Sequence, residues 1–175
     1  MAVPLKHKED APKRLGFAIA TCSSSRYSLK VKLEEFTDPS GDRAVGLLEG
    51  SGHQIIVREV LPDDPAAIRS FLMRVLDDGR VDSVILIGGT GVSRDDSTIE
   101  AVEPLLDKKL PGFGELLRNI SYRRVGSPAM MTRAIAGIAD GKAVFCLPGS
   151  PEAVETAVRE LIMPEIGHIM KLCRG

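Results

Sequence analysis

The segment Gly88-Gly89-Thr90-Gly91 directly follows an apolar run and has the composition of an anion-binding loop. Glycines leave backbone N–H groups unobstructed and let the chain wrap closely around an anion, and Thr90 adds a hydroxyl group. The chemistry that this loop predicts is phosphate binding. Its spacing is neither GxGxxG nor GxxxxGK[ST], and glycines after a strand often serve only as a turn, so both interpretations stay open.

Two other polar segments also follow apolar runs. The segment Ser23-Ser24-Ser25, followed by Arg26, offers hydroxyl groups and a guanidinium that suit a phosphate or an anionic pterin side chain. A solvated polar turn would have the same composition. The segment Pro148-Gly149-Ser150-Pro151 predicts a tight turn with a proline at the start of a helix, a structural role that requires no ligand.

Two pairs of carboxylates accompany these segments. Asp63 and Asp64 follow one predicted strand, and Asp95 and Asp96 follow another, so one member of each pair could meet the other across neighbouring strand ends. Two carboxylates with phosphate oxygens and water form a common Mg²⁺ arrangement. Asp64 precedes a proline and is interpreted as a helix cap, which leaves Asp63 for the site.

No residues suggest covalent catalysis. His7 lies in a polar N-terminal segment, and His53 and His168 fall in a predicted surface connection and a late helix. The three cysteines are odd in number and lack metal-ligand spacing, so inert thiols in a reducing cytoplasm are expected. The chemistry expected is therefore substrate positioning assisted by a metal.

Length and charge limit the class of protein. The 175 residues correspond to one compact domain, expected over residues 14–175 after a mobile tail at residues 1–13. The 23 Lys and Arg residues nearly cancel the 24 Asp and Glu residues, so no basic excess favours nucleic acid. No apolar run approaches the roughly 20 residues of a membrane helix, and we expect a cytoplasmic protein without a membrane contact.

Strands and helices are predicted to alternate along the chain. Short apolar runs predict buried strands at residues 15–22, 54–61, 83–87 and 143–147. Residues 23–41 read as an extended loop whose end caps a helix. Helices are predicted over residues 44–48, from Pro65 to residue 76, after Ser97-Thr98, over 112–121, near 130–138, and from Pro151 through 161. The fold class is α/β, a three-layer doubly wound, mostly parallel sheet with helices on both faces, and its ligands would bind beyond the carboxyl ends of the strands.

The combined motifs resemble the molybdenum cofactor biosynthesis family of MoaB and MogA type, which includes molybdopterin adenylyltransferases. The resemblance runs from Leu15 to the C-terminus. Its carriers are Gly88-Gly89-Thr90-Gly91 with Asp96-Ser97-Thr98-Ile99-Glu100, then Pro111-Gly112-Phe113-Gly114-Glu115, Thr132-Arg133-Ala134 with Ala136-Gly137, and Pro148-Gly149-Ser150-Pro151.

This resemblance implies adenylylation of molybdopterin by ATP, with Mg²⁺ as cofactor and pyrophosphate as the second product. Asp63 and Asp96 would act in adenylyl transfer and hold Mg²⁺. Binding of nucleotide or pterin would fall to Ser23, Ser24, Ser25, Gly88, Gly89, Thr90, Gly91, Thr98, Glu115, Arg133, Pro148, Gly149 and Ser150. The resemblance also implies a homotrimer or homohexamer, with a molybdenum-insertion enzyme as a further partner.

Two positions depart from the family pattern, and two other functions stay open. Many relatives have Ser-Asp where Ser23-Ser24 stands and Arg where Asp95 stands, differences that bear on nucleotide affinity. A paralogue that binds or scaffolds molybdopterin without catalysis would have the same motifs. A flavodoxin-like FMN protein would share the alternation of strands and helices, but with no Trp and two Tyr this chain is poor in rings for flavin stacking.

Overall fold

The computed structural model describes residues 11–174, and residues 1–10, which include His7 and most of the predicted tail, lie outside that range. Within the described residues one six-stranded sheet has the order β2-β1-β3-β6-β5-β4. The strands are β1 (Gly16–Cys22), β2 (Gln54–Leu61), β3 (Ser83–Ile87), β4 (Lys108–Lys109), β5 (Ile135–Ala139) and β6 (Lys142–Leu147). The pairs β1·β2, β1·β3 and β3·β6 are parallel, whereas β4·β5 and β5·β6 are antiparallel, so the mostly parallel sheet is confirmed.

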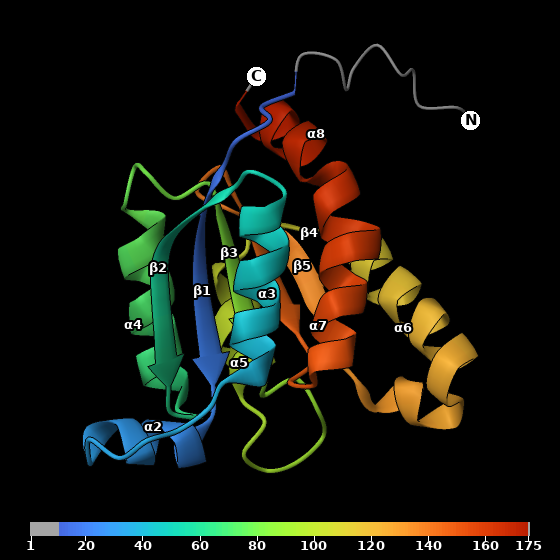
Figure 1. The fold of residues 1–175 in the computed structure, drawn as a ribbon. Coiled ribbons are helices and arrows are strands. Elements are labelled where there is room, and N and C mark those ends of the chain that lie inside the picture. Colours follow the sequence, from blue (N-terminus) through green and yellow to red (C-terminus); the bar gives the residue numbers. More distant parts are fainter. Residues whose placement is uncertain (1–10, 175) are drawn as a thin grey trace.

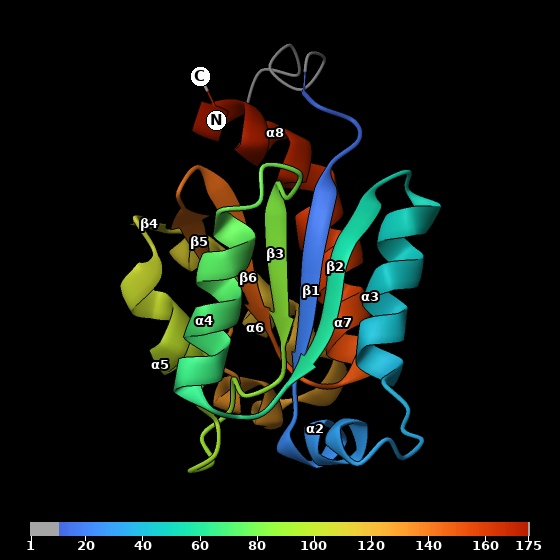
Figure 2. The ribbon, with the colours of Figure 1, turned by 90° about the vertical axis from the view of Figure 1, so that its left-hand side faces the viewer.

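Helices cover both faces of this sheet (Figure 1). They are α3 (Pro39–Gly50), α4 (Pro65–Leu76), α5 (Thr98–Val102), α6 (Pro111–Val125), α7 (Pro151–Ala157) and α8 (Met163–Arg174). Helix α2 (Ser24–Val31) buries no residue and lies beyond the carboxyl ends of β1 and β2. Figure 2 looks onto the face covered by α4 and α5. The opposite face packs against α3, α6, α7 and α8, which gives the expected three layers.

The alternation of side chains along each strand explains the two cores. In β1, Phe17 and Ile19 belong to the cluster with α3 and α7, and Ala18 and Ala20 belong to the cluster with α4. All seven residues of β1 are buried, as expected for a strand covered on both faces. The predicted bounds of β2 and β3 match the structure. Because β1, β2, β3 and β6 run parallel, the loops that follow these four strands lie at the same edge of the sheet.

The prediction of a helix near residues 130–138 is wrong. This stretch holds a short 3-10 helix, η2 (Ser127–Met131), and then strand β5. The strand forms a hairpin with β6 through Asp140 and Gly141, whose φ angles of 49° and 69° suit a two-residue turn. Pairing with β6 and burial beside α6 outweigh the helical spacing of the apolar residues.

Three other expectations need correction. Residues 23–41 are not one extended loop, because Ser23 caps α2. The C-terminal helix continues beyond residue 161, through the π-helical segment η3 (Val158–Ile162) and α8, to Arg174. His53 is half-buried, with its ring edge-on to Phe17 at 5.2 Å between centroids, and its Nδ1 accepts a hydrogen bond from the N–H of Leu15. No helix within residues 11–174 is long and apolar enough to cross a membrane.

Candidate active site

The glycine loop after β3 has the backbone conformation that its sequence predicts. Gly88 and Gly89 have φ angles of 98° and 63°, the left-handed region that favours glycine. A Cβ on Gly88 would lie 2.5 Å from the carbonyl oxygen of Cys22, and one on Gly89 would lie 2.3 Å from Oγ1 of Thr98. Both glycines are therefore required by the turn itself, and the phosphate-binding interpretation needs further support.

Two hydrogen bonds hold Gly88, the first residue of this loop. The N–H of Gly88 donates to the carbonyl of Leu147 at 2.9 Å, and the hydroxyl of Thr98 donates to the carbonyl of Gly88 at 2.8 Å. Thr98 is fully buried, so its side chain supports the loop from the protein interior and does not face solvent. Within residues 11–174, no acceptor pairs with the N–H groups of Gly89, Thr90 or Gly91, which leaves three successive donors for an anion.

Arg133 joins the glycine loop to the segment that carries Asp96. Its guanidinium donates to the carbonyl of Gly91 at 2.7 Å and to the carbonyl of Asp96 at 3.3 Å, and it forms an ion pair with Glu100 on α5. Its own N–H donates to the carbonyl of Thr90 at 2.9 Å. The hydrogen bond from Arg133 lowers the pKa of Glu100, and the same bond raises the pKa of Arg133. The side chain of Arg133 therefore holds the glycine loop against the Asp96 segment and α5.

Asp96 lies beside a cavity at this edge. The cavity has a volume of about 540 Å³ and is lined by Pro65, Val92, Ser93, Arg94, Asp96, Ser97, Glu100 and Arg133. One carboxylate oxygen of Asp96, Oδ2, accepts a hydrogen bond from the N–H of Ser93 at 2.8 Å. That bond orients the carboxylate within its own loop, and Oδ1 has no hydrogen-bond partner among residues 11–174.

Asp63 has a reciprocal contact with the first turn of α2. Its Oδ2 accepts from the N–H of Ser24 at 2.7 Å, and its own N–H donates to the hydroxyl of Ser24 at 2.9 Å. The hydroxyl of Ser97 lies 3.4 Å from the carbonyl oxygen of Asp63, which links this turn to the segment after β3. Asp64 caps α4 by accepting from the N–H of Ala67 at 2.8 Å, as predicted. Asp63, which the sequence assigns to the metal site, thus also supports the start of α2 with one carboxylate oxygen, and its Oδ1 has no hydrogen-bond partner among residues 11–174.

The donor set around these loops fits a magnesium ion that arrives with a nucleotide. Mg²⁺ prefers oxygen ligands and is usually held by one or two carboxylates, substrate phosphates and water. Asp63 and Asp96 each keep one carboxylate oxygen, Oδ1, without a hydrogen-bond partner among residues 11–174. No group of three or more His, Cys, Asp or Glu residues within residues 11–174 could enclose a metal, so phosphate oxygens would have to complete the coordination.

The remaining predicted residues take several positions. Ser23 caps α2, and its hydroxyl lies 3.1 Å from that of Ser25, so these serines begin a helix. Ser150 caps α7 by accepting from the N–H of Ala153 at 3.2 Å, which fits the structural interpretation of Pro148-Gly149-Ser150-Pro151. That turn nonetheless lies against the glycine loop, since a Cβ on Gly149 would be 3.5 Å from Cα of Gly88. Glu115 lines a separate cavity of about 400 Å³ together with Arg118 and Arg133.

The two buried thiols and His168 supply no nucleophile at the site. Burial raises the pKa of Cys22 to about 12 and also raises that of Cys146. Both thiols are therefore protonated at neutral pH, which removes them as nucleophiles. His168 lies on α8 near Glu165, and α8 packs at the other end of the sheet from the glycine loop (Figure 1).

Sequence reasoning missed a buried polar network beside β1. The carboxylate of Asp38 is buried and accepts from the hydroxyl of Thr21 at 2.8 Å, the N–H of Gly41 at 3.1 Å and the guanidinium of Arg58 at 3.3 Å. Burial opposes the charge of Arg58, but hydrogen bonds to Asp42 and Asp38 outweigh it and raise its pKa. The network fixes the start of α3, from which the hydroxyl of Ser40 donates to the carbonyl of Gly149 at 2.6 Å. The motif Asp-Pro-Ser-Gly predicts the helix cap, but not these long-range partners.

Comparison with known proteins identifies the family of this chain. Residues 18–168 match the family described as "Probable molybdopterin binding domain". The chain is 40% identical over 168 residues to Molybdenum cofactor biosynthesis protein B of Halalkalibacterium halodurans, covering 95% of this chain and 94% of the relative. It is 39% identical over 173 residues to the Molybdopterin adenylyltransferase of Pyrococcus furiosus, covering 97% of each chain.

A solved structure is also similar over nearly the whole chain. The tungsten cofactor synthesizing protein MoaB from Pyrococcus furiosus superposes with a TM-score of 0.82 and 37% identity, covering 94% of this chain and all of the other. Together with the matched family description, this confirms the resemblance inferred from the motifs. The chain belongs to the MoaB/MogA family of molybdenum cofactor biosynthesis proteins.

Proposed function

We propose that this chain is a molybdopterin adenylyltransferase that uses ATP and Mg²⁺. The terminal phosphate of molybdopterin attacks the α-phosphorus of ATP, a new P–O bond forms, and the bond to pyrophosphate breaks. The products are adenylyl-molybdopterin and pyrophosphate. Similar proteins named molybdopterin adenylyltransferase support this assignment. The observation that carries it is the glycine loop, whose three unpaired N–H donors lie on the same sheet edge as Asp63 and Asp96.

The residues act mainly by positioning and by neutralising charge. Phosphoryl-type transfer gains most from alignment of the attacking and leaving oxygens and from positive charge near the developing negative charge. The N–H groups of Gly89, Thr90 and Gly91 would donate to phosphate oxygens. The free oxygens of Asp63 and Asp96 would hold Mg²⁺ or its bound water, and a bound Mg²⁺ would supply the positive charge. In such a mechanism the backbone N–H groups and the metal-binding carboxylates act without a side-chain nucleophile, and none was identified among the described residues at this edge of the sheet.

Other residues would complete the substrate pockets. The first turn of α2, with Ser23, Ser24 and Ser25, presents hydroxyl groups beside Asp63. The cavity lined by Glu115 and Arg118 on α6 adjoins Arg133 and is the candidate for the pterin. A homotrimer or homohexamer and a contact with a molybdenum-insertion enzyme, both implied by the family, belong to this proposal.

One assay separates catalysis from binding. Purified protein is incubated with molybdopterin, ATP and Mg²⁺, and pyrophosphate and adenylyl-molybdopterin are measured together. We expect stoichiometric formation of both products, with none when molybdopterin or Mg²⁺ is omitted. In Asp63→Asn we expect a higher Mg²⁺ concentration for half-maximal rate. An unchanged Mg²⁺ requirement would assign Asp63 to the cap of α2 alone.

The second candidate is a protein that binds or scaffolds molybdopterin without transferring AMP. Several similar proteins are named only as Molybdenum cofactor biosynthesis protein B, a name that states no activity. Binding of molybdopterin measured by calorimetry, with no pyrophosphate formed from ATP, would establish this candidate and overturn the first.

A further inference from the structure

The cavity of about 540 Å³ beside Asp96 (the Asp96 cavity) is lined by one arginine that has no partner in the protein. The charged residues in its lining are Arg94, Asp96, Glu100 and Arg133. Arg133 is paired with Glu100 and donates to two carbonyl groups. Arg94 is exposed, and within residues 11–174 its guanidinium forms no hydrogen bond or ion pair, not even with the neighbouring Asp95 or Asp96. The Asp96 cavity therefore keeps one free guanidinium.

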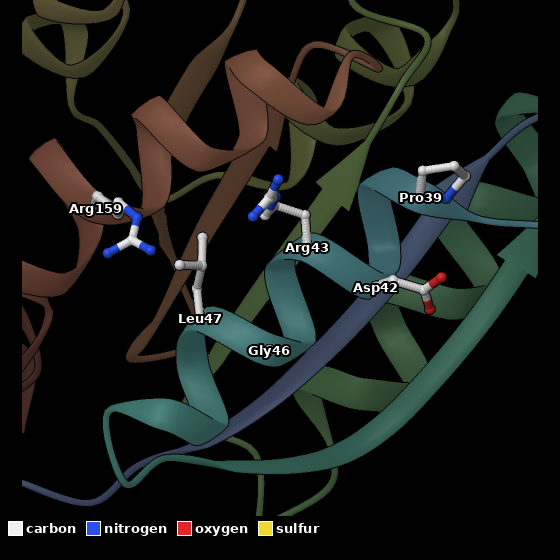
Figure 3. Close-up of a pocket in the computed structure, with 6 residues that line it drawn as sticks. All are labelled: Pro39, Asp42, Arg43, Gly46, Leu47 and Arg159. Atoms are coloured by element: carbon white, nitrogen blue, oxygen red, sulfur yellow. The ribbon is translucent and has the colours of Figure 1, made fainter.

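Arginines in two other cavities differ from Arg94 in this respect. The groove between α3 and α7 has a volume of about 440 Å³, and Figure 3 shows Arg43 on α3 and Arg159 on the facing helix beside it. These two guanidinium groups lie 3.5 and 2.9 Å from the carboxylate of Glu155. In the cavity of about 400 Å³ along α6 (the α6 cavity), Arg118 donates to a backbone carbonyl group at 3.4 Å. Among the arginines that line these three cavities, only Arg94 has all its donors available for a ligand.

The Asp96 cavity and the α6 cavity meet at Arg133. This residue lines both cavities, and they share no other lining residue. The Asp96 cavity is bordered by α4 and α5, which cover one face of the sheet, whereas α6 lies on the opposite face. Arg133 is bonded to the carbonyl groups of Thr90 and Gly91, so the glycine loop lies where the two cavities meet. A phosphate on this loop would have access to both.

This arrangement suits a displacement in line. In phosphoryl-type transfer the attacking and leaving oxygens lie on opposite sides of the phosphorus. We propose that Arg94 binds the leaving pyrophosphate of ATP in the Asp96 cavity while molybdopterin attacks from the α6 cavity, an inference that rests on the proposed adenylyl transfer. The bond from the α-phosphorus to the bridging oxygen breaks, and its electron pair stays on pyrophosphate. Arg94 keeps its proton and donates hydrogen bonds to the pyrophosphate oxygens.

The charges at this edge of the sheet give a free guanidinium a role. The carboxylates of Asp63 and Asp96, which would hold Mg²⁺, also repel the phosphates of ATP, and pyrophosphate gains negative charge as the bond breaks. Glu100 already balances the charge of Arg133, so Arg94 is the cation left to offset this repulsion. The lining of the Asp96 cavity contains no aromatic side chain on which adenine could stack. Its chemistry therefore favours phosphate groups over the base.

Calorimetry on folded protein separates pyrophosphate binding from nucleotide binding. Pyrophosphate with Mg²⁺, and AMP, are titrated separately into the wild type, Arg94→Gln and Arg94→Lys. We expect the affinity for pyrophosphate to fall about tenfold or more in Arg94→Gln and about threefold in Arg94→Lys, which keeps the charge but loses the planar fork. The affinity for AMP and the melting temperature should be unchanged, since Arg94 has no partner within residues 11–174. Arg14→Gln is the matched control, because Arg14 is also exposed but precedes β1, at the end of the sheet away from the glycine loop.

Turnover supplies a second readout. In the adenylyl-transfer assay, Arg94→Gln should lower kcat/KM for ATP about tenfold and weaken inhibition by added pyrophosphate to a similar extent. Unchanged pyrophosphate affinity in Arg94→Gln, an equal loss of AMP affinity, or the same loss in Arg14→Gln would each overturn the inference. The titration needs no turnover. Absence of adenylyl transfer in the wild type would thus overturn the proposed function alone, and the titration would still decide whether Arg94 binds pyrophosphate.

Discussion

Replacing Arg133 by glutamine removes the guanidinium that joins the glycine loop, the Asp96 segment and α5. The side chain loses its bond to the carbonyl of Gly91, its weaker bond to the carbonyl of Asp96 and its ion pair with Glu100. The backbone bond from residue 133 to Thr90 is unaffected, because it involves only main-chain atoms. The change therefore loosens the loop while the N–H donors of Gly89, Thr90 and Gly91 and the carboxylate of Asp96 stay in the chain.

The expected loss of stability is modest. The Arg133 and Glu100 side chains are 36% and 55% exposed. At such exposure an ion pair contributes at most about 1 kcal/mol after solvent screening. The bond to the Gly91 carbonyl adds about 1 kcal/mol. A total near 2 kcal/mol corresponds to a fall of roughly 4 to 8 °C in melting temperature for a domain of this size.

The expected loss of activity is larger than the loss of stability implies. A shift of about 1 Å in a group that positions a reacting phosphate lowers the rate by roughly 100-fold. We therefore expect kcat/KM for pyrophosphate release to fall by about 30- to 100-fold in Arg133→Gln, at a temperature where the variant is fully folded. Glu100→Gln is the control, since Arg133 then keeps both carbonyl partners, and its rate should fall by no more than about threefold. A folded Arg133→Gln variant with wild-type kcat/KM would refute the claim that the Arg133 side chain positions the glycine loop for catalysis.

Three further changes test the site and the fold. Asp96→Asn should lower adenylyl transfer by two or more orders of magnitude, near ~3 kcal/mol of lost electrostatic stabilisation, with the melting temperature retained; full pyrophosphate release would remove this residue from the mechanism. Gly89→Val should lower the free energy of unfolding by ~1 to 3 kcal/mol, because residue 89 has a positive φ and a side chain there would collide with Thr98. Calorimetry on the folded fraction should also show weaker binding of ATP–Mg²⁺ and of molybdopterin, and unchanged affinity for both would show that the glycine loop is only a turn. Burial lowers the pKa of His53, whose Nδ1 accepts a hydrogen bond from the N–H of Leu15. The free energy of unfolding should therefore fall as the pH drops from about 7 through the pKa of His53 in the folded protein, and His53→Gln should lose less stability over that range.

Much of the sheet could be predicted because buried parallel strands leave a clear pattern. The continuous apolar runs that form β1 and β3 are buried on both faces, and their predicted limits match the structure within one residue. The start of α4 was equally predictable, since Asp64 and Pro65 satisfy the helix terminus locally.

The antiparallel edge was not predicted because its pattern is ambiguous. Residues 135–139 combine small and apolar side chains that suit a strand or a helix, and only pairing with β6 decides between them. The Asp140-Gly141 turn is a hairpin signal, and giving it weight would have predicted β5. Helix α2 was missed for a similar reason, because its eight residues contain no buried side chain and thus no apolar face.

The candidate site shows why structural and functional interpretations of the same residue need not compete. Sequence reasoning assigned Asp63 to the metal site, and in the structure one of its carboxylate oxygens accepts from the N–H of Ser24 at the start of α2, while the other has no hydrogen-bond partner among residues 11–174. The same holds for Gly89, which the turn requires and whose N–H has no acceptor among residues 11–174. Contacts that fix a loop also preorganise the groups that it presents, and preorganised groups stabilise a transition state better than mobile ones. Loss of stability in a variant at these positions therefore does not argue against a role in catalysis, and affinity and rate must be measured on folded protein.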